Sequence, residues 1–203
     1  MNIVAVSKQQ SADAIAAAHR AGLRHFGESY VQEALPKMAA LADLPITWHF
    51  IGSAQTNKTR AIAEHFDWVH TIDRSKIAER LSAQRPHLAA PLNVLIQVNQ
   101  GGETQKGGVA EPEVEALARS ILALPRLKLR GLMTIPPPSG ERASTFFAEL
   151  AALRTRLAAT GIGLDTLSMG MSADFEPAVE AGATFVRIGT AIFGPRSAAS
   201  LSQ

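Results

Sequence analysis

Short apolar segments and longer helix-like segments alternate along this chain, and this alternation constrains the fold more than any other feature. Each apolar segment has the composition of a strand that is buried on both faces. No two-residue turn joins neighbouring apolar segments, so the strands should run parallel. The units are Ile3–Val6 with Ala12–Ala21, Arg24–Phe26 with Tyr30–Leu41, Ile46–Ile51 with Thr56–His65, Trp68–Ile72 with Lys76–Gln84, Asn93–Val98 with Pro112–Leu124, Leu127–Ile135 with Ala143–Ala159, Leu164–Leu167 with Ser172–Ala181, and Phe185–Ile188 with a short helix after Pro195. Eight such units predict an α/β protein folded as a single parallel (β/α)8 TIM barrel.

Composition supports one domain, residues 1–203, and narrows the classes of function. With 46% hydrophobic and 19% charged residues, the chain can build a large core. A net charge of +2, with scattered basic residues and 5% aromatic residues, argues against nucleic acid as a ligand. The lack of cysteine excludes thiolate zinc sites, and the six histidines show no metal-ligand spacing, so no metal site is expected. No apolar stretch approaches the ~20 residues of a membrane span, and no signal region precedes the first strand, so we expect a cytoplasmic protein without membrane contact.

Polar residues gather at the carboxyl ends of the predicted strands. In a barrel of this kind, those ends and the loops that follow them carry the function. The positions are far more polar than the strand bodies, which suggests a ligand pocket on one face of the barrel. They are occupied by Lys8, Glu28, His49 with Gly52, Asp73, Asn99, Met133 with Thr134, Ser168 and Arg187.

Lys8 follows the first apolar strand, Val4-Ala-Val-Ser, and precedes a polar loop. We expect its amine to project into the mouth of the barrel. A neutral lysine amine in such a place forms imines with carbonyl compounds. The alternative is an ordinary solvated lysine at a strand end, which is where most lysines lie.

Two turns of small residues follow the last two strands, Ser168 to Ser172 and Gly189-Thr190. Barrels often build a phosphate site from the loops after strands seven and eight. Glycine lets backbone N–H groups approach an anion, hydroxyls add donors, and a helix beginning near Ser172 would add a favourable dipole. Ordinary turn and cap chemistry explains either turn alone, but less easily both in adjacent loops.

Arg187 lies within the last strand, between Val186 and Ile188, and alternation places its side chain in the barrel interior. A buried guanidinium needs an acceptor. A pyridine nitrogen would serve, and so would a carboxylate such as Asp165 or Glu180. A lysine, two phosphate-sized turns and an arginine at one face together predict a Schiff-base site for pyridoxal 5′-phosphate (PLP).

Other apparent motifs do not carry a function. Gly52 to Thr59 imitates a P-loop but has Asn57 where the second glycine is required. His49, between two aromatic residues, is interpreted as a strand histidine rather than a metal ligand. Met169 and Met171 are interpreted as packing residues.

Several stretches resemble the pyridoxal phosphate homeostasis protein family, whose fold is that of the alanine racemase N-terminal domain. They occur in the order of the family and cover nearly the whole chain. Family members usually carry a helix before the first strand, which the expected barrel lacks, and Ser29 stands where the family usually has asparagine. The matching stretches begin with Val4 to Lys8, Phe26 to Glu33, Trp48 to Gly52 with Gln55 to Lys58, and His70 to Asp73, and continue with Arg130 to Met133, Leu167 to Asp174, and Val186 to Thr190 with Phe193-Gly194.

The resemblance implies roles for particular residues. Lys8 would form the internal aldimine with PLP, and Arg187 would lie near the pyridine nitrogen. The phosphate would be held by Ser172, Gly189 and Thr190. The rest of the pocket would be lined by Asn57, Met133 and Ser168.

The function we expect is PLP homeostasis: the protein would hold the cofactor intracellularly and deliver it to PLP-dependent apo-enzymes, as a monomer and without catalysis of its own. Racemases of this fold use a second base from an added domain, and the single tyrosine here, Tyr30, lies in the second predicted helix. An arginine at the pyridine nitrogen also weakens the cofactor as an electron sink. The alternatives are a PLP-dependent amino-acid racemase and a barrel aldolase that uses Lys8 on a sugar phosphate.

Overall fold

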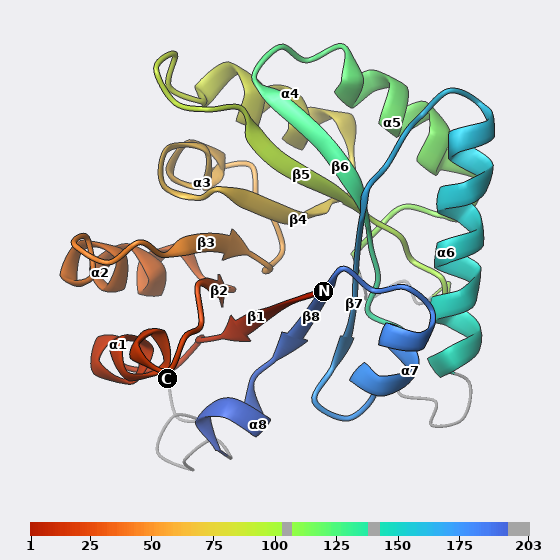
Figure 1. Ribbon diagram of the computed structural model, residues 1–203. Helices are drawn as coiled ribbons and strands as arrows, with labels where there is room; N and C mark the ends of the chain where they lie inside the picture. The colour runs from red at the N-terminus through yellow and green to blue at the C-terminus, as the bar shows by residue number, and fades with distance from the viewer. Residues whose placement is uncertain (103–106, 138–142, 195–203) are drawn as a thin grey trace.

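The chain folds into a closed barrel of eight parallel strands with helices around the outside (Figure 1). This computed structural model describes residues 1–102, 107–137 and 143–194. Neighbouring strands pair in sequence order, and β1 (Asn2–Val6) pairs with β8 (Phe185–Ile188) to close the ring. The predicted (β/α)8 fold is therefore confirmed.

The remaining strands are β2 (His25–Glu28), β3 (Thr47–Phe50), β4 (Trp68–Ile72), β5 (Leu92–Gln97), β6 (Leu127–Met133) and β7 (Thr166–Met171). The helices are α1 (Ala12–Arg20), α2 (Val31–Ala40), α3 (Thr59–His65), α4 (Ser75–Gln84), α5 (Val114–Leu122), α6 (Ala143–Ala159), α7 (Phe175–Glu180) and α8 (Thr190–Phe193), with a 3₁₀ turn, η1 (Glu111–Glu113), before α5. These bounds lie within a few residues of most of the predicted ones. Strands and helices alternate because the apolar runs and the amphipathic segments do.

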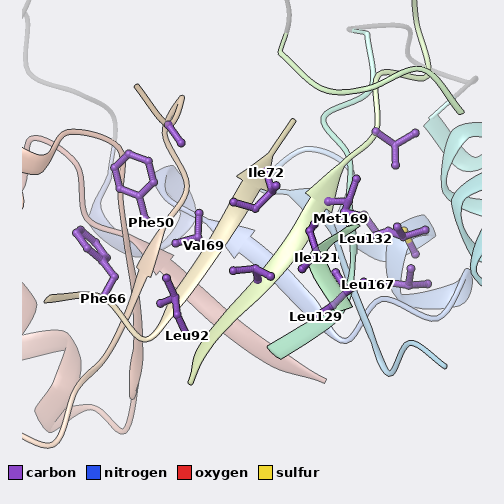
Figure 2. Close-up of a cluster of buried hydrophobic side chains, with 14 of the residues drawn as sticks. Phe50, Phe66, Val69, Ile72, Leu92, Ile121, Leu129, Leu132, Leu167 and Met169 are labelled. Carbon is purple, nitrogen blue, oxygen red and sulfur yellow. The ribbon is translucent and has the colours of Figure 1, made fainter. Parts of the chain in front are cut away.

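The main core lies between the strands and the surrounding helices. Figure 2 shows its buried side chains, with Phe50 and Phe66 near one end and Leu132, Leu167 and Met169 near the other. A second, smaller cluster belongs to the barrel interior, and its members are Val4, Trp68, Leu95, Met133 and Phe185. Burial of one such large side chain stabilises the fold by about 1.5–3 kcal/mol. Side chains thus pack on both faces of the strands, and this packing fixes the positions of the strand ends.

Local details differ from the predictions at several helix starts. Ser11 caps α1, since its Oγ accepts from the Ala14 N–H at 3.2 Å. Asp73, whose side chain has the chemistry of an N-cap for α4, instead accepts a bond from the Arg74 side chain at 2.6 Å. The seventh helix begins at Phe175, three residues later than predicted from Ser172. The short helix α8 was not predicted, and the helix expected after Pro195 lies outside the described residues.

Among the helices of the described ranges, none has both the length and the apolar character that crossing a membrane requires.

Candidate functional site

A cavity of about 270 Å³ opens at the carboxyl ends of β1, β7 and β8. This volume lies just below the roughly 300–1,000 Å³ of typical ligand pockets. The loop after β1 meets the loops after β7 and β8, from the opposite end of the sequence, because β8 closes the ring against β1. The lining residues are Val6, Lys8, Gln10, Met171, Ser172, Ala173, Arg187, Gly189, Thr190 and Gly194.

Lys8 lies in a tight loop just after β1, where it lines the cavity. The next residue, Gln9, adopts φ of +63°, a left-handed conformation that is uncommon outside glycine. Its backbone N–H donates a short hydrogen bond to the carboxylate of Glu33 on α2. The loop that carries the amine is therefore fixed from outside the barrel.

The same loop rests on a buried group of charges. The ammonium of Lys37 donates to the Ser7 carbonyl and to Glu28 Oε1, both at 2.9 Å, and pairs with Glu33 at 2.5 Å. The Glu28 side chain is fully buried and also accepts a 2.6 Å bond from the Ser7 hydroxyl. Burial raises the pKa of the Glu28 carboxyl, and the bonds from Ser7 and Lys37 oppose this rise.

These residues were not predicted to support Lys8. Glu28 was singled out as a polar strand end, but the structure places it beneath the Lys8 loop and not in the cavity. The spacing of Glu33 and Lys37 is that of an i,i+4 ion pair, which the sequence could have shown. What the sequence could not show is that this pair faces inward onto the loop after β1.

The turn after β7 brings Ser172 into the cavity. At Gly170 the backbone φ is +88°, and a Cβ there would approach the Ala178 Cβ to 2.5 Å, so a larger residue does not fit. The following Met171 N–H donates to Asp174 Oδ1 at 2.6 Å, which closes the turn. Met171 is 38% exposed and lines the cavity, so its interpretation as a packing residue was wrong, whereas Met169 is buried in the core.

The turn after β8 brings Gly189 and Thr190 to the same cavity. Thr190 is the first residue of α8, and the first N–H groups of a helix lack partners within it. A Cβ at Gly189 would meet only atoms of Val6, the nearest being its Cβ at 3.5 Å, which is an ordinary contact distance. The protein therefore leaves space for a ligand atom at Gly189. The Thr190 hydroxyl and the first backbone N–H groups of α8 lie beside this space as hydrogen-bond donors.

Arg187 reaches the cavity from the barrel interior and is 4% exposed. Its guanidinium donates to Ser168 Oγ and to the Thr134 carbonyl, both at 2.8 Å. Asp165, one of the carboxylates considered as its partner, pairs with Arg130 instead, at 2.8 Å. Burial lowers the pKa of Arg187 to about 10, so the guanidinium stays charged at neutral pH.

The other predicted pocket residues do not line this cavity. Ser168 lies one step behind it, bonded to Arg187 and to His70 Nδ1 at 2.9 Å. Met133 is fully buried in the interior cluster, and Asn57 is exposed in the segment before α3. Their roles at the ligand stay predictions.

The donors around the cavity fit a phosphorylated aldehyde. Lys8 offers an amine, Ser172 and Thr190 offer hydroxyls, and Gly189 permits close approach of an anion to the backbone. Arg187 offers a fixed cationic donor to the base of the ligand. The parts of the chain that the structure describes contain no group of three or more His, Asp or Glu side chains that could hold a metal ion.

A larger hollow, of about 410 Å³, lies on the outer surface between the α5 and α6 regions. Its charged residues already pair with one another or with neighbours: Arg156 with Glu111, and Glu115 with Arg119. It offers no amine for an aldehyde and lies away from the strand ends. The cavity at Lys8 is therefore the better candidate.

Comparison with known proteins gives consistent matches. The family model for the alanine racemase N-terminal domain matches residues 1–197. The pyridoxal phosphate homeostasis protein of Pseudomonas aeruginosa is 59% identical over 196 residues, which are 97% of this chain and 85% of that protein. Its namesake from Escherichia coli is 51% identical over 205 residues, covering 97% of this chain and 86% of that protein.

Solved structures agree in fold. PipY of Synechococcus elongatus with PLP bound has a TM-score of 0.88 and 39% identity, over 96% of this chain and 92% of that chain. An alanine racemase of Clostridium difficile has a TM-score of 0.76 but 15% identity, over 97% of this chain and 53% of that chain. The second likeness concerns the fold alone.

Proposed function

This chain belongs to the pyridoxal phosphate homeostasis proteins, within the alanine racemase N-terminal domain family, and on that premise we propose that it binds PLP through Lys8 and acts in PLP homeostasis. One observation carries the proposal. The amine of Lys8, the hydroxyls of Ser172 and Thr190, the Gly189 turn and the Arg187 guanidinium all line one cavity. A relative at 39% identity binds PLP in its solved structure.

Each residue has a separate task in this proposal. When bound, the cofactor supplies an aldehyde that condenses reversibly with the Lys8 amine and releases water. Ser172, Gly189 and Thr190 bind the phosphate with hydroxyl and backbone donors. Arg187, which lines the cavity and is held by Ser168 and the Thr134 carbonyl, would lie near the pyridine nitrogen of the cofactor. Because the guanidinium stays protonated at neutral pH, the pyridine nitrogen beside it would stay unprotonated. An unprotonated nitrogen weakens the cofactor as an electron sink.

Removal of one phosphate donor should weaken cofactor binding without loss of the fold. Thr190→Ala deletes one charge-assisted hydrogen bond, worth about 1.5–3 kcal/mol, so PLP affinity should fall about ten- to a hundred-fold. Pyridoxal without phosphate should bind nearly as well as to the wild type. Equilibrium titration by absorbance with both ligands measures this. Equal losses for the two ligands would assign Thr190 to the fold and not to the phosphate.

We propose a carrier and not an enzyme. Tyr30, the single tyrosine, is 58% exposed and lines a different hollow beside Lys58, so it supplies no second base at Lys8. The racemase alternative is favoured only by the shared fold. With saturating PLP, the protein should exchange the α-deuterium of alanine no faster than free PLP does. Proton NMR of the amino acid follows this exchange, and rapid exchange that depends on Lys8 would establish the racemase instead.

The proposed role also implies partners and a place. Transient contact with PLP-dependent apo-enzymes in the cytoplasm would deliver the cofactor, and a monomer with residues 1–203 as one unit suffices for this. Ser168 is proposed to act at the pocket through its hydrogen bond to Arg187. Asn57 and Met133 are proposed to line the pocket around bound PLP, as the family resemblance implies.

A further inference from the structure

A chain of hydrogen-bonded histidines runs through the interior of the barrel. His25 Nδ1 lies 2.9 Å from His49 Nε2, and His49 Nδ1 lies 2.8 Å from His70 Nε2. His70 Nδ1 in turn lies 2.9 Å from Ser168 Oγ, which accepts from Arg187. The chain therefore ends directly behind the cavity.

The hydrogen-bonded residues run from the amino-terminal end of the barrel into its buried interior. His25 is the first residue of β2, at the amino-terminal end, and is only half-buried. His49, His70 and Ser168 are fully buried, each the third residue of its strand. Ring contacts hold the imidazoles in place: His49 stacks on Trp68, with ring centroids 5.6 Å apart. Phe185 meets the His25, His49 and His70 rings edge-on or tilted.

We infer that His25, His49 and His70 form a proton relay that links Arg187 at the cavity, and Ser168 behind it, to solvent at the amino-terminal end of the barrel. The ring nitrogens of His49 and His70 are already used in hydrogen bonds to the neighbouring rings and to Ser168. These nitrogens are therefore not arranged as metal ligands, and no metal-binding group is found among the described residues. No part of the proposed function uses the three histidines.

The donor and acceptor capacities of these groups determine the direction in which the hydrogen bonds run in the ligand-free protein. A guanidinium only donates, so Ser168 accepts from Arg187 and its own hydroxyl donates to His70 Nδ1. His70 then donates from Nε2 to His49, and His49 donates from Nε2 to His25. This direction leaves the His25 proton on Nε2, for which the described residues offer no partner, at the half-buried end of the chain.

The hydrogen-bond chain reverses when Arg187, which lines the cavity, gives one guanidinium proton to Ser168 and regains one from an acid in the cavity. The Ser168 proton passes to His70 Nδ1, the His70 Nε2 proton passes to His49 Nδ1, and the His49 Nε2 proton passes to His25 Nδ1. His25 is then an imidazolium and can release its Nε2 proton to solvent. One proton has moved, and each ring has changed its tautomer. The reverse sequence brings a solvent proton inward.

Burial and nearby charges determine which histidine carries the added proton when the hydrogen bonds reverse. Burial lowers the pKa of His25, and the nearby Asp67 carboxylate opposes this shift. Burial also lowers the pKa values of His49 and His70 strongly, and Arg187 lowers that of His70 further, so these two rings stay neutral. Arg130, over the Trp68 ring, is paired with Asp165. Of the three rings, His25 is therefore the one that becomes positively charged, and its pKa lies below the ordinary histidine pKa of 6.5.

The test is a pH titration of the ligand-free protein with ¹⁵N-labelled histidine, followed by NMR. As His25 titrates, the protonated nitrogen of His49 and of His70 should change from Nε2 to Nδ1 with the same midpoint. In His25→Gln, whose amide can still bond to His49, the pH dependence of both rings should be lost. His87→Gln, an exposed control, should leave it unchanged. Constant tautomers of His49 and His70 while His25 titrates in the wild type would overturn the relay.

A second arm adds PLP and rests on the proposed function. Because linkage is reciprocal, a ligand that contacts Arg187 should shift the His25 midpoint in the wild type, and the shift should be absent in Ser168→Ala. No shift despite bound PLP would separate the relay from the pocket and overturn this coupling. If PLP fails to bind at all, the proposed function fails, while the ligand-free titration still decides the relay.

Discussion

Replacement of Lys8 by alanine should abolish covalent retention of PLP while the barrel stays folded. Lys8 is half-buried at the cavity and, within the described ranges, its ammonium takes part in no ion pair, so its loss leaves no buried charge without a partner. The phosphate donors remain, and each charge-assisted bond they make contributes about 1.5–3 kcal/mol, so weak reversible binding should persist. Borohydride reduction followed by mass spectrometry of the peptides measures the covalent fraction. We expect it to fall from near-complete to none.

Two matched variants make this result specific. Lys8→Arg keeps the positive charge but cannot condense with an aldehyde, so it should lose the adduct as completely as Lys8→Ala. Lys58→Ala removes a lysine that lines a separate hollow near β3, and it should retain the adduct. An adduct that survives in Lys8→Ala and disappears in Lys58→Ala would move the site to the other side of the barrel mouth.

The fold was predictable because each strand and helix has its own local signal. The apolar run of β5, and the Ser11 and Gly22 that flank α1, mark their elements regardless of what lies across the barrel. The order of strands then follows from chain connectivity, since successive parallel units pair with their neighbours. The predicted start of α7 was wrong for a related reason. Asp73 and Ser172 have N-cap chemistry, but their surroundings assign them to an ion pair and to the cavity.

The candidate site was predictable only where residues follow a strand and face the cavity themselves. Lys8, Arg187 and Thr190 were found that way. The residues that act at a distance were not, because their partners are far apart in sequence. His70 and Ser168 are 98 positions apart, and Lys37 and Ser7 are 30 apart. His49 was correctly placed in a strand, but nothing in its neighbours Trp48 and Phe50 reveals the rings on either side of it.

Replacement of Lys37 by methionine should cost more stability than any other single change at the buried charges beneath Lys8. The Glu28 carboxylate is fully buried, its Oε2 has no partner among the described residues, and its Oε1 depends on Lys37 and Ser7. Loss of one partner of such a pair leaves a buried charge uncompensated, which costs about 3–5 kcal/mol. Urea denaturation at neutral pH should show a loss of this size. Lys76→Met, an exposed lysine on α4, should stay within about 0.5 kcal/mol of the wild type.

The pH dependence of that loss identifies its cause. Burial already raises the pKa of Glu28, and removal of the Lys37 charge should raise it further. A carboxyl whose pKa is higher in the folded state favours folding when it is protonated, so the deficit of Lys37→Met should shrink as the pH falls toward 4.5 and below. Glu28→Gln combined with Lys37→Met removes the charge altogether and should recover part of the lost stability at neutral pH. A deficit that is independent of pH and unchanged in the double variant would instead attribute the loss to packing of the Lys37 side chain.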